Sequence, residues 1–361
     1  MRVPFLDLRV SGEEKKRLQT IFSRVLDHGM LVMGPELTEF ESVVSKYVGR
    51  KYAVGVASGS DAVFLALKAV GVKKGDEVIT TCLSWIATAN AIARCGATPV
   101  FADIDDDLNV SVSSIQRLIN KKTRAILTVD YTGRLCDYDS IVPICKEYNI
   151  KLVEDGSQAF GASRSGFKCG AIGDVSAVSN NPMKVYAALG EAGTVFTDDP
   201  ETQNILEILR YNGTIHKEEC IMPSLNSRMD ALQAAFLTDK LPKVIDVINQ
   251  RNANADFLNG NLHESIIKPL KYQNEIHVFY TYTIVTERRD DLARHLSKLE
   301  IETKIQHPIL MCDQAPYLHN RSEKIKGTFY RDRILSLPIH ERLTQDQLEF
   351  MVKSINNFFI N

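Results

Sequence analysis

Short β-branched runs alternate with segments of helical periodicity over the first two-thirds of this chain, and this feature most constrains its fold. Repeated units of this kind predict an α/β protein with a mainly parallel sheet between helices. Seven strands are expected, at 52–57, 77–80, 99–103, 125–129, 151–154, 175–179 and 194–197. The helices between them are expected at 61–70, 86–95, 113–120 and 138–148.

The pattern changes near residue 240. A helical stretch from 229 to 257 contains Pro242, which should break or kink it. Further on we expect an antiparallel strand at 277–286, a helix at 290–299, an extended segment at 301–305 and a closing helix at 345–359. The sequence therefore predicts a large domain over 1–239 and a smaller α+β domain over 240–361, which suits a length of 361 residues.

Composition excludes several classes of function. With 43 Lys+Arg, 45 Asp+Glu and no basic stripe, nothing in the chain would gather nucleic acid. No window approaches the roughly 18 apolar residues of a membrane span, and the N-terminus lacks the apolar region of a signal peptide, so a cytoplasmic protein is expected. Seven cysteines without a C-x-x-C pair favour reduced thiols over disulfides or a zinc site.

The common phosphate and metal motifs are absent from the sequence. No G-x-G-x-x-G follows a predicted strand, so a dinucleotide fingerprint is improbable. The run from Asp103 to Asp107 begins like a calcium loop, but Leu108 replaces its turn glycine. The eight histidines form no pair at zinc-ligand spacing. We therefore expect no metal.

Three other features carry chemistry together. Ser58-Gly59-Ser60 precedes a helix, where free backbone N–H groups and the helix dipole can hold a phosphate, although serine there is also an ordinary N-cap. Asp155 follows a buried strand, at the sheet edge where ligands bind, and could hold a protonated heteroaromatic nitrogen or cap the next segment. Lys184 follows the strand that ends at Ser179 and could form a Schiff base.

Pyridoxal phosphate (PLP) requires these parts in one site. It needs a lysine for its aldehyde, a carboxylate for its pyridine nitrogen, a phosphate cup and a flat surface against its ring. Trp85, the one tryptophan, follows the strand at 77–80 and could cover a face of the ring; the alternative is a core aromatic.

At this point the ordered motifs resemble the DegT-like sugar-nucleotide aminotransferases, a branch of the fold-type-I PLP enzymes. The matching segments are VPFLDL, MGPELTEFE, SGSDAVFLALKAVGVKKGDEVIT, SWIATANAI, GATPVFADID, VEDGSQAFGA, SNNPMK, GEAG, LNSRMDALQAAFL and LSLPIHERLTQDQ. They span nearly the whole chain. The resemblance implies a large PLP domain, a small C-terminal domain and a homodimer whose active sites lie at the subunit interface.

The resemblance also implies roles for individual residues. Lys184 matches the Schiff-base lysine and Asp155 the partner of the pyridine nitrogen. Gln158 matches a cofactor-contacting glutamine, and Trp85 matches the aromatic residue that stacks on the ring.

The phosphate contacts of the family fall on three further positions, Gly59, Ser60 and Ser179. Asn226 looks like the asparagine that reaches the phosphate from the neighbouring subunit, and Arg228 is a weaker candidate for the same side of the site.

Several positions depart from the family pattern. Asn180 replaces an aromatic residue, and Gly190-Glu191-Ala192-Gly193 replaces GEGG or GDGG. Gln306 and His307 stand where the family has His/Tyr-Tyr, and Leu31 stands where an aromatic residue is frequent. In the family these positions lie near the sugar, so Leu31, Gln306 and His307, with Arg228, are candidate substrate contacts whose identity leaves the sugar open.

The family activity implies transfer of an amino group from an amino acid, with L-glutamate expected, to a keto group of a nucleotide-linked sugar. A dehydratase or deoxygenase of the same family is one alternative, although the dehydratases carry histidine in place of the lysine. A PLP-binding or sugar-binding regulatory protein that has lost turnover is another, and intact Lys184, Asp155 and Gln158 argue against it.

Overall fold

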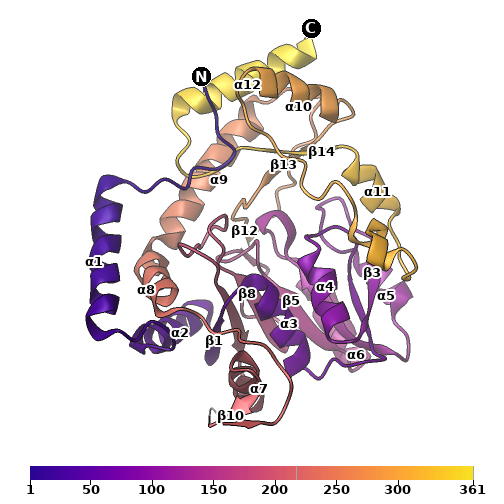
Figure 1. The fold of residues 1–361 in the computed structure, drawn as a ribbon. Coiled ribbons are helices and arrows are strands. Elements are labelled where there is room, and N and C mark those ends of the chain that lie inside the picture. The colour runs from indigo at the N-terminus through magenta and orange to yellow at the C-terminus, as the bar shows by residue number, and fades with distance from the viewer. Residues whose placement is uncertain (217, 361) are drawn as a thin grey trace.

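The large sheet has the seven strands expected from the sequence. The computed structural model describes residues 1–216 and 218–360 (Figure 1). In chain order the strands are β1 (Tyr52–Val56), β2 (Glu77–Thr81), β3 (Thr98–Ala102), β4 (Thr123–Val129), β5 (Lys151–Asp155), β8 (Val175–Ser179) and β9 (Gly193–Thr197). Their order in the sheet is β1-β9-β8-β5-β4-β2-β3, and β9 alone of these seven runs antiparallel to its neighbours. The prediction of a mainly parallel α/β sheet is confirmed.

Helices bury both faces of this sheet. They are α2 (Pro35–Val48), α3 (Gly59–Ala69), α4 (Ala87–Arg94), α5 (Val112–Leu118), α6 (Tyr138–Glu147), α7 (Pro200–Arg210) and α8 (Ala231–Lys240). Neighbouring strand residues pack into opposite clusters: Leu152 joins α2, α5, α6 and α8, whereas Val153 joins α3, α4 and α7. Burial on both faces explains why the strands read as continuous apolar runs.

The C-terminal part builds its own core. Its elements are α9 (Val244–Asn261), β12 (Glu275–Ile276), β13 (Tyr282–Val285), α10 (Arg289–Lys298), α11 (Ile325–Arg331), β14 (Ile334–Leu337) and α12 (Gln345–Ile360). The expected break at Pro242 is a 3₁₀ turn, Leu241–Lys243, between α8 and α9. The strand expected at 277–286 pairs only over Tyr282–Val285, with β14. Residues 301–305 add only isolated bridges, at Ile301 and Lys304.

The two chain ends lie close together over this C-terminal core (Figure 1). Val3 pairs with Ile301 and belongs to the same hydrophobic cluster as α9, α10 and α12. The C-terminal part also contacts the large sheet, because Ser322 pairs with Phe101 in the edge strand β3. The division at residue 240 stays a prediction.

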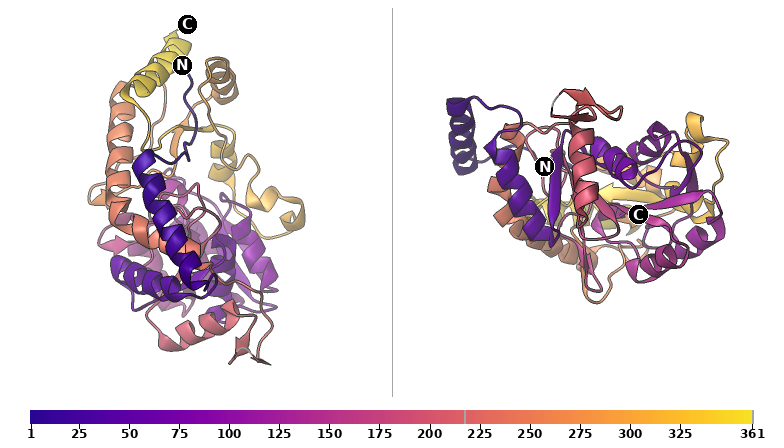
Figure 2. Two further views of the ribbon diagram at one scale, coloured as in Figure 1. Left: turned by 60° about the vertical axis from the view of Figure 1, so that its left-hand side comes forward. Right: turned by 90° about the horizontal axis from the view of Figure 1, so that it is seen from below.

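Helix α1 (Gly12–His28) is attached to the rest of the molecule along one side (Figure 2). Its buried residues Leu18, Ile21 and Val25 pack against α8. Phe22 and Leu26, on its other side, are exposed. None of the described helices combines the length and apolar character that crossing a bilayer requires.

The remaining strands are short. They are β6 (Ser163–Arg164), β7 (Phe167–Lys168), β10 (Thr214–Ile215) and β11 (Glu219–Cys220). All seven cysteines are free, and Cys220 alone of them is exposed.

Candidate active site

The predicted phosphate cradle lies where β1 leads into α3. The Ser58 side chain accepts a hydrogen bond from the Asp61 N–H at 3.1 Å, so Ser58 caps the helix. The cap leaves the N–H groups of Gly59 and Ser60 in the unpaired first turn. A Cβ on Gly59 would lie 2.4 Å from Cβ of Ser179, at the end of β8. The cap and the cradle are therefore compatible, and the fold brings Gly59 and Ser179 together.

Gly59→Ala should weaken PLP binding by about tenfold or more, roughly 1.4 kcal/mol, because the new methyl group displaces Ser179 from the cradle. Gly12→Ala is the matched control, since a Cβ there meets nothing within 4 Å. Equilibrium dialysis against PLP measures both affinities. An unchanged PLP affinity in Gly59→Ala would remove Gly59 from the cradle.

Asp155 ends β5 and is buried. Its carboxylate accepts hydrogen bonds from the Thr88 hydroxyl at 3.2 Å and from the Ser157 N–H at 3.1 Å. Burial raises the pKa of Asp155, while the bonds from Ser157 and the charge of Lys184 oppose that rise. The carboxylate is thus held in a fixed orientation close to the Lys184 amine.

Lys184 carries an amine with no fixed partner. Its Nζ lies 4.4 Å from the centre of the Tyr280 ring and makes no hydrogen bond or ion pair within residues 1–216 and 218–360. The loop behind it is rigid, because buried Asn180 donates to the Tyr186 carbonyl at 3.2 Å and accepts from the Thr194 hydroxyl at 2.9 Å. The replacement of an aromatic residue by Asn180 therefore has a structural role in holding the lysine loop.

Aromatic rings gather around His307, on which the charge of Lys184 also acts. Trp85 lies 6.1 Å from His307, ring centre to ring centre, and is 63% exposed, so a face of its indole is free. Tyr131 lies 5.7 Å from His307 on another side. Burial, with the charges of Lys304 and Lys184, lowers the pKa of His307 to about 4, so its imidazole is neutral near pH 7.

Gln158 is hydrogen-bonded to the backbone beside the site. Its side-chain oxygen accepts a hydrogen bond from the Thr132 N–H at 3.0 Å. Thr132 has φ of 61°, a strained value for a β-branched residue. Gln158 therefore anchors a strained turn next to Tyr131.

Asn226 and Arg228 lie beside the end of β1, where Arg228 pairs with Val56 and the Ser227 carbonyl accepts from the Ala57 N–H. The Arg228 guanidinium donates to the Asn226 side-chain oxygen at 2.8 Å, and the exposed Asn226 pairs with Tyr211 through its backbone. Exposed Leu31 accepts from the Ala231 N–H through its carbonyl. In the part of the chain that the structure describes, no hydrogen bond, ion pair or ring contact joins these three to Lys184, Asp155 or Trp85.

Sequence reasoning missed Thr88, Tyr280 and Lys304. Thr88 lies three residues after Trp85 at the start of α4, so helical spacing could have placed it near the same face. Tyr280 contacts Lys184, and Lys304 lines a cavity beside Tyr280, from segments about a hundred residues away, which no local pattern reports.

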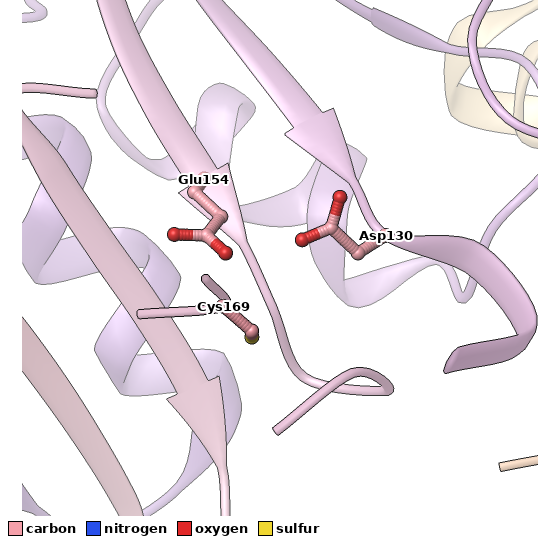
Figure 3. A group of neighbouring side chains, drawn as sticks. All are labelled: Asp130, Glu154 and Cys169. Atoms are coloured by element: carbon pink, nitrogen blue, oxygen red, sulfur yellow. The ribbon is translucent and has the colours of Figure 1, made fainter. Parts of the chain in front are cut away.

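A buried acidic pair, Asp130 and Glu154, lies beside Cys169 (Figure 3). One carboxylate oxygen of Asp130, one of Glu154 and the sulfur atom of Cys169 all lie within 4.8 Å of one another. Asp130 accepts from the Tyr138 hydroxyl at 2.8 Å through one oxygen, while its other oxygen has no donor. Burial, and then the charge of Glu154, raise the pKa of Asp130 well above its usual range. Asp130 therefore keeps its proton and donates it toward Glu154.

This shared proton makes stability depend on pH. Above pH about 4 the unfolded chain releases the Asp130 proton and the folded chain keeps it. The free energy of unfolding should then fall by about 1.4 kcal/mol per pH unit until the raised pKa is passed. Asp130→Asn, whose amide replaces the shared proton, should lose this slope.

Urea unfolding at a series of pH values from about 5 to 8 measures that slope in the native chain and the variant. Exposed Asp139→Asn on α6 is the control and should follow the native curve. Parallel curves for the native chain and Asp130→Asn would show that the pair holds no proton over this range.

The residues around Lys184 fit PLP. A free amine, a buried oriented carboxylate and an exposed indole converge there, and the start of α3 approaches Ser179 so closely that only glycine is accommodated. These are the parts that the cofactor's aldehyde, ring nitrogen, ring face and phosphate require.

Comparison with known proteins agrees with this geometry. The family described as DegT/DnrJ/EryC1/StrS aminotransferases matches residues 12–356. A dTDP-3-amino-3,6-dideoxy-alpha-D-galactopyranose transaminase of Aneurinibacillus thermoaerophilus is 34% identical over 99% of both chains. A pleiotropic regulatory protein of Geobacillus stearothermophilus is 32% identical over 99% of both. The crystal structure of NtdA from Bacillus subtilis with bound cofactor PMP superposes with a TM-score of 0.93 at 26% identity, covering 100% of this chain and 86% of NtdA.

Proposed function

The chain belongs to the DegT/DnrJ/EryC1/StrS aminotransferase family, and on this premise we propose that it transfers an amino group from an amino acid to a keto carbon of a nucleotide-linked sugar. The observation that carries the proposal is the free Lys184 amine beside a buried, oriented carboxylate. Its cofactor is PLP, as in its family.

The proposal gives each residue a task. PLP, when bound, supplies a ring that accepts the electron pair released as the donor's α-carbon loses its proton. Asp155 holds the ring nitrogen in its protonated form, and Thr88 and Ser157 fix the carboxylate that does so. Lys184 holds the cofactor between turnovers. It then takes the proton from the donor's α-carbon and returns it to the cofactor carbon that carried the aldehyde.

The other assigned residues position the cofactor. Gly59, Ser60 and Ser179 receive its phosphate, and Trp85 covers the ring face that the structure leaves exposed. Gln158 keeps the Thr132 turn in place against the ring. His307, neutral at pH 7, faces the substrate without adding charge.

L-Glutamate is the proposed donor. The test loads the holoenzyme with L-glutamate, isolates the aminated form, and adds a panel of nucleotide-linked keto-sugars one at a time. A member of the panel should restore the absorbance of the lysine-bound cofactor. A protein that never accepts an amino group from any donor would fit a regulatory role instead.

The proposed assembly is a homodimer with shared active sites. The apolar side chains of Phe22, Leu26, Met30, Leu31 and Val32 are all exposed on one continuous segment, which is more apolar surface than a monomer's helix normally leaves open. Exposed Asn226 presents its amide outward in the single chain. A second copy that covers this segment would let Asn226 reach its neighbour's phosphate cradle.

Mixing two inactive variants tests the shared site. Lys184→Ala and Asn226→Ala homodimers should each be inactive or strongly impaired. After they exchange subunits, a mixed dimer holds one site with both native residues, so about a quarter of native activity should return. No recovery, with exchange confirmed by native mass spectrometry, would place Asn226 outside its neighbour's site.

The proposal extends to organisation and location. We assign the cofactor to a domain of residues 1–239 and the closing of the cleft to residues 240–361. Seven free cysteines favour a reducing compartment, so the cytoplasm is the proposed location.

A further inference from the structure

A small cavity lies next to the lysine loop, with Met183 in its wall. Its volume is about 70 Å³, and residues that line it include Phe5, Met183, Arg251, Tyr280, Lys304 and Gln306. The N-terminal arm forms one wall, which is fixed because the Phe5 N–H donates to Glu302 at 2.9 Å. The Tyr280 ring forms another wall, and Lys184 Nζ lies 4.4 Å from the centre of that ring. The cavity is therefore separated from the reacting amine by one side chain.

Polar groups with no partner face this cavity. Gln306 is only 6% exposed, yet its amide makes no hydrogen bond to any residue that the structure describes. The Gln306 amide is therefore available to a ligand that enters the cavity. The ammonium group of Lys304 and the hydroxyl of Tyr280 are likewise unpaired within residues 1–216 and 218–360.

The charge of the cavity is positive. Arg251 is already neutralised, because its guanidinium donates to Glu341 at 2.9 Å and to the Phe279 carbonyl at 3.0 Å. Lys304 is exposed to solvent at the rim of the cavity and has no counterion among the described residues. Its charge also lowers the pKa of His307, which places it within electrostatic reach of the ring beside Trp85. An anion is the ligand that balances this cavity.

The cavity volume of about 70 Å³ is sufficient for a group as small as a carboxylate. A cation, an amide N–H and a phenol are donors that a carboxylate's two oxygens can accept together.

We propose that this cavity, with Lys304, Gln306 and Tyr280 as its donors, binds a carboxylate of the amino-acid donor. The inference rests on the proposed function, since only an enzyme that takes an amino group from an amino acid meets such a substrate at Lys184. Lys304 and Gln306 then determine donor selection, while the keto-sugar makes its contacts elsewhere in the site.

The first test measures binding without chemistry. Glutarate has two carboxylates and no amine, so calorimetric titration of the holoenzyme reports the carboxylate site alone. Lys304→Met should weaken glutarate binding by about tenfold or more, and Lys304→Arg should largely restore it. Exposed Lys298→Met, on α10, is the matched control and should bind as the native chain does.

The second test separates the two half-reactions. In Lys304→Met and Gln306→Leu, the KM for L-glutamate should rise by about tenfold or more, with kcat changed less. The KM for the keto-sugar in the second half-reaction should stay within about twofold of native.

Three results would overturn the inference: no glutarate binding to the native holoenzyme, unchanged glutarate affinity in Lys304→Met, or a rise in KM confined to the keto-sugar. The last would assign the cavity to the sugar substrate. Failure of the proposed function is distinct, because the native enzyme would then aminate no keto-sugar while glutarate binding still reports on the cavity.

Discussion

Lys184→Ala should lose covalently held PLP and lower kcat by about 10⁴-fold or more, because a methyl group neither holds the cofactor's aldehyde nor moves the α-proton. In the described structure the Lys184 amine is free and sits over Tyr280, so its removal breaks no hydrogen bond or ion pair. The fold and the unfolding midpoint should therefore stay close to native.

Borohydride reduction followed by peptide mass spectrometry measures the covalent link, and initial rates measure turnover. The control is Lys353→Ala, an exposed lysine on α12, which should keep both. A reduced cofactor found on any other lysine, or near-native turnover in Lys184→Ala, would contradict the assignment.

Asp155→Asn has the second largest expected effect, a loss of about 10²–10⁴-fold in kcat. The amide keeps the size of the side chain; its oxygen can still accept from the Ser157 N–H, and its NH2 group can donate to the Thr88 hydroxyl oxygen. It lacks the negative charge that keeps the ring nitrogen protonated. Turnover should therefore fall although the local geometry survives.

The same substitution should not lower the free energy of unfolding, although it lowers kcat. Burial raises the pKa of Asp155, so its ionised form is costly in the folded chain above pH about 4. Asp155→Asn removes that cost, and its free energy of unfolding at pH 8 should equal or exceed the native value. Thr88→Val, which only loosens the carboxylate, should cost far less kcat. Near-normal turnover in Asp155→Asn would remove Asp155 from its role.

The sheet was predictable because its strands are buried on both faces. Strand β8 occurs at the predicted residues, and the other six predicted strands overlap the observed ones, since β-branched runs and flanking turns mark them. Helices α1 and α2, at residues 12–48, were not assigned. Helix α1 packs along only one side and leaves Phe22 and Leu26 exposed, so its apolar pattern does not match a simple core-facing stripe.

The site was predictable only where it follows strand ends. Gly59, Asp155 and Lys184 lie in the loops that follow predicted strands, whose ends sheet geometry brings to one region. Tyr280 and Lys304 come from irregular segments whose position depends on how the C-terminal core docks. In the proposed homodimer, Asn226 would act on the cradle of a second copy, whose placement one chain's sequence does not determine.

The most direct test of the central claim follows the nitrogen atom. The holoenzyme is incubated with ¹⁵N-labelled L-glutamate and the keto-sugar nucleotide that the panel selects, and the sugar product is analysed by mass spectrometry. We predict a product that carries the ¹⁵N amino group in place of the keto oxygen, with an equal amount of 2-oxoglutarate. A sugar that loses oxygen without gaining nitrogen, or no reaction with any sugar of the panel, would contradict the account.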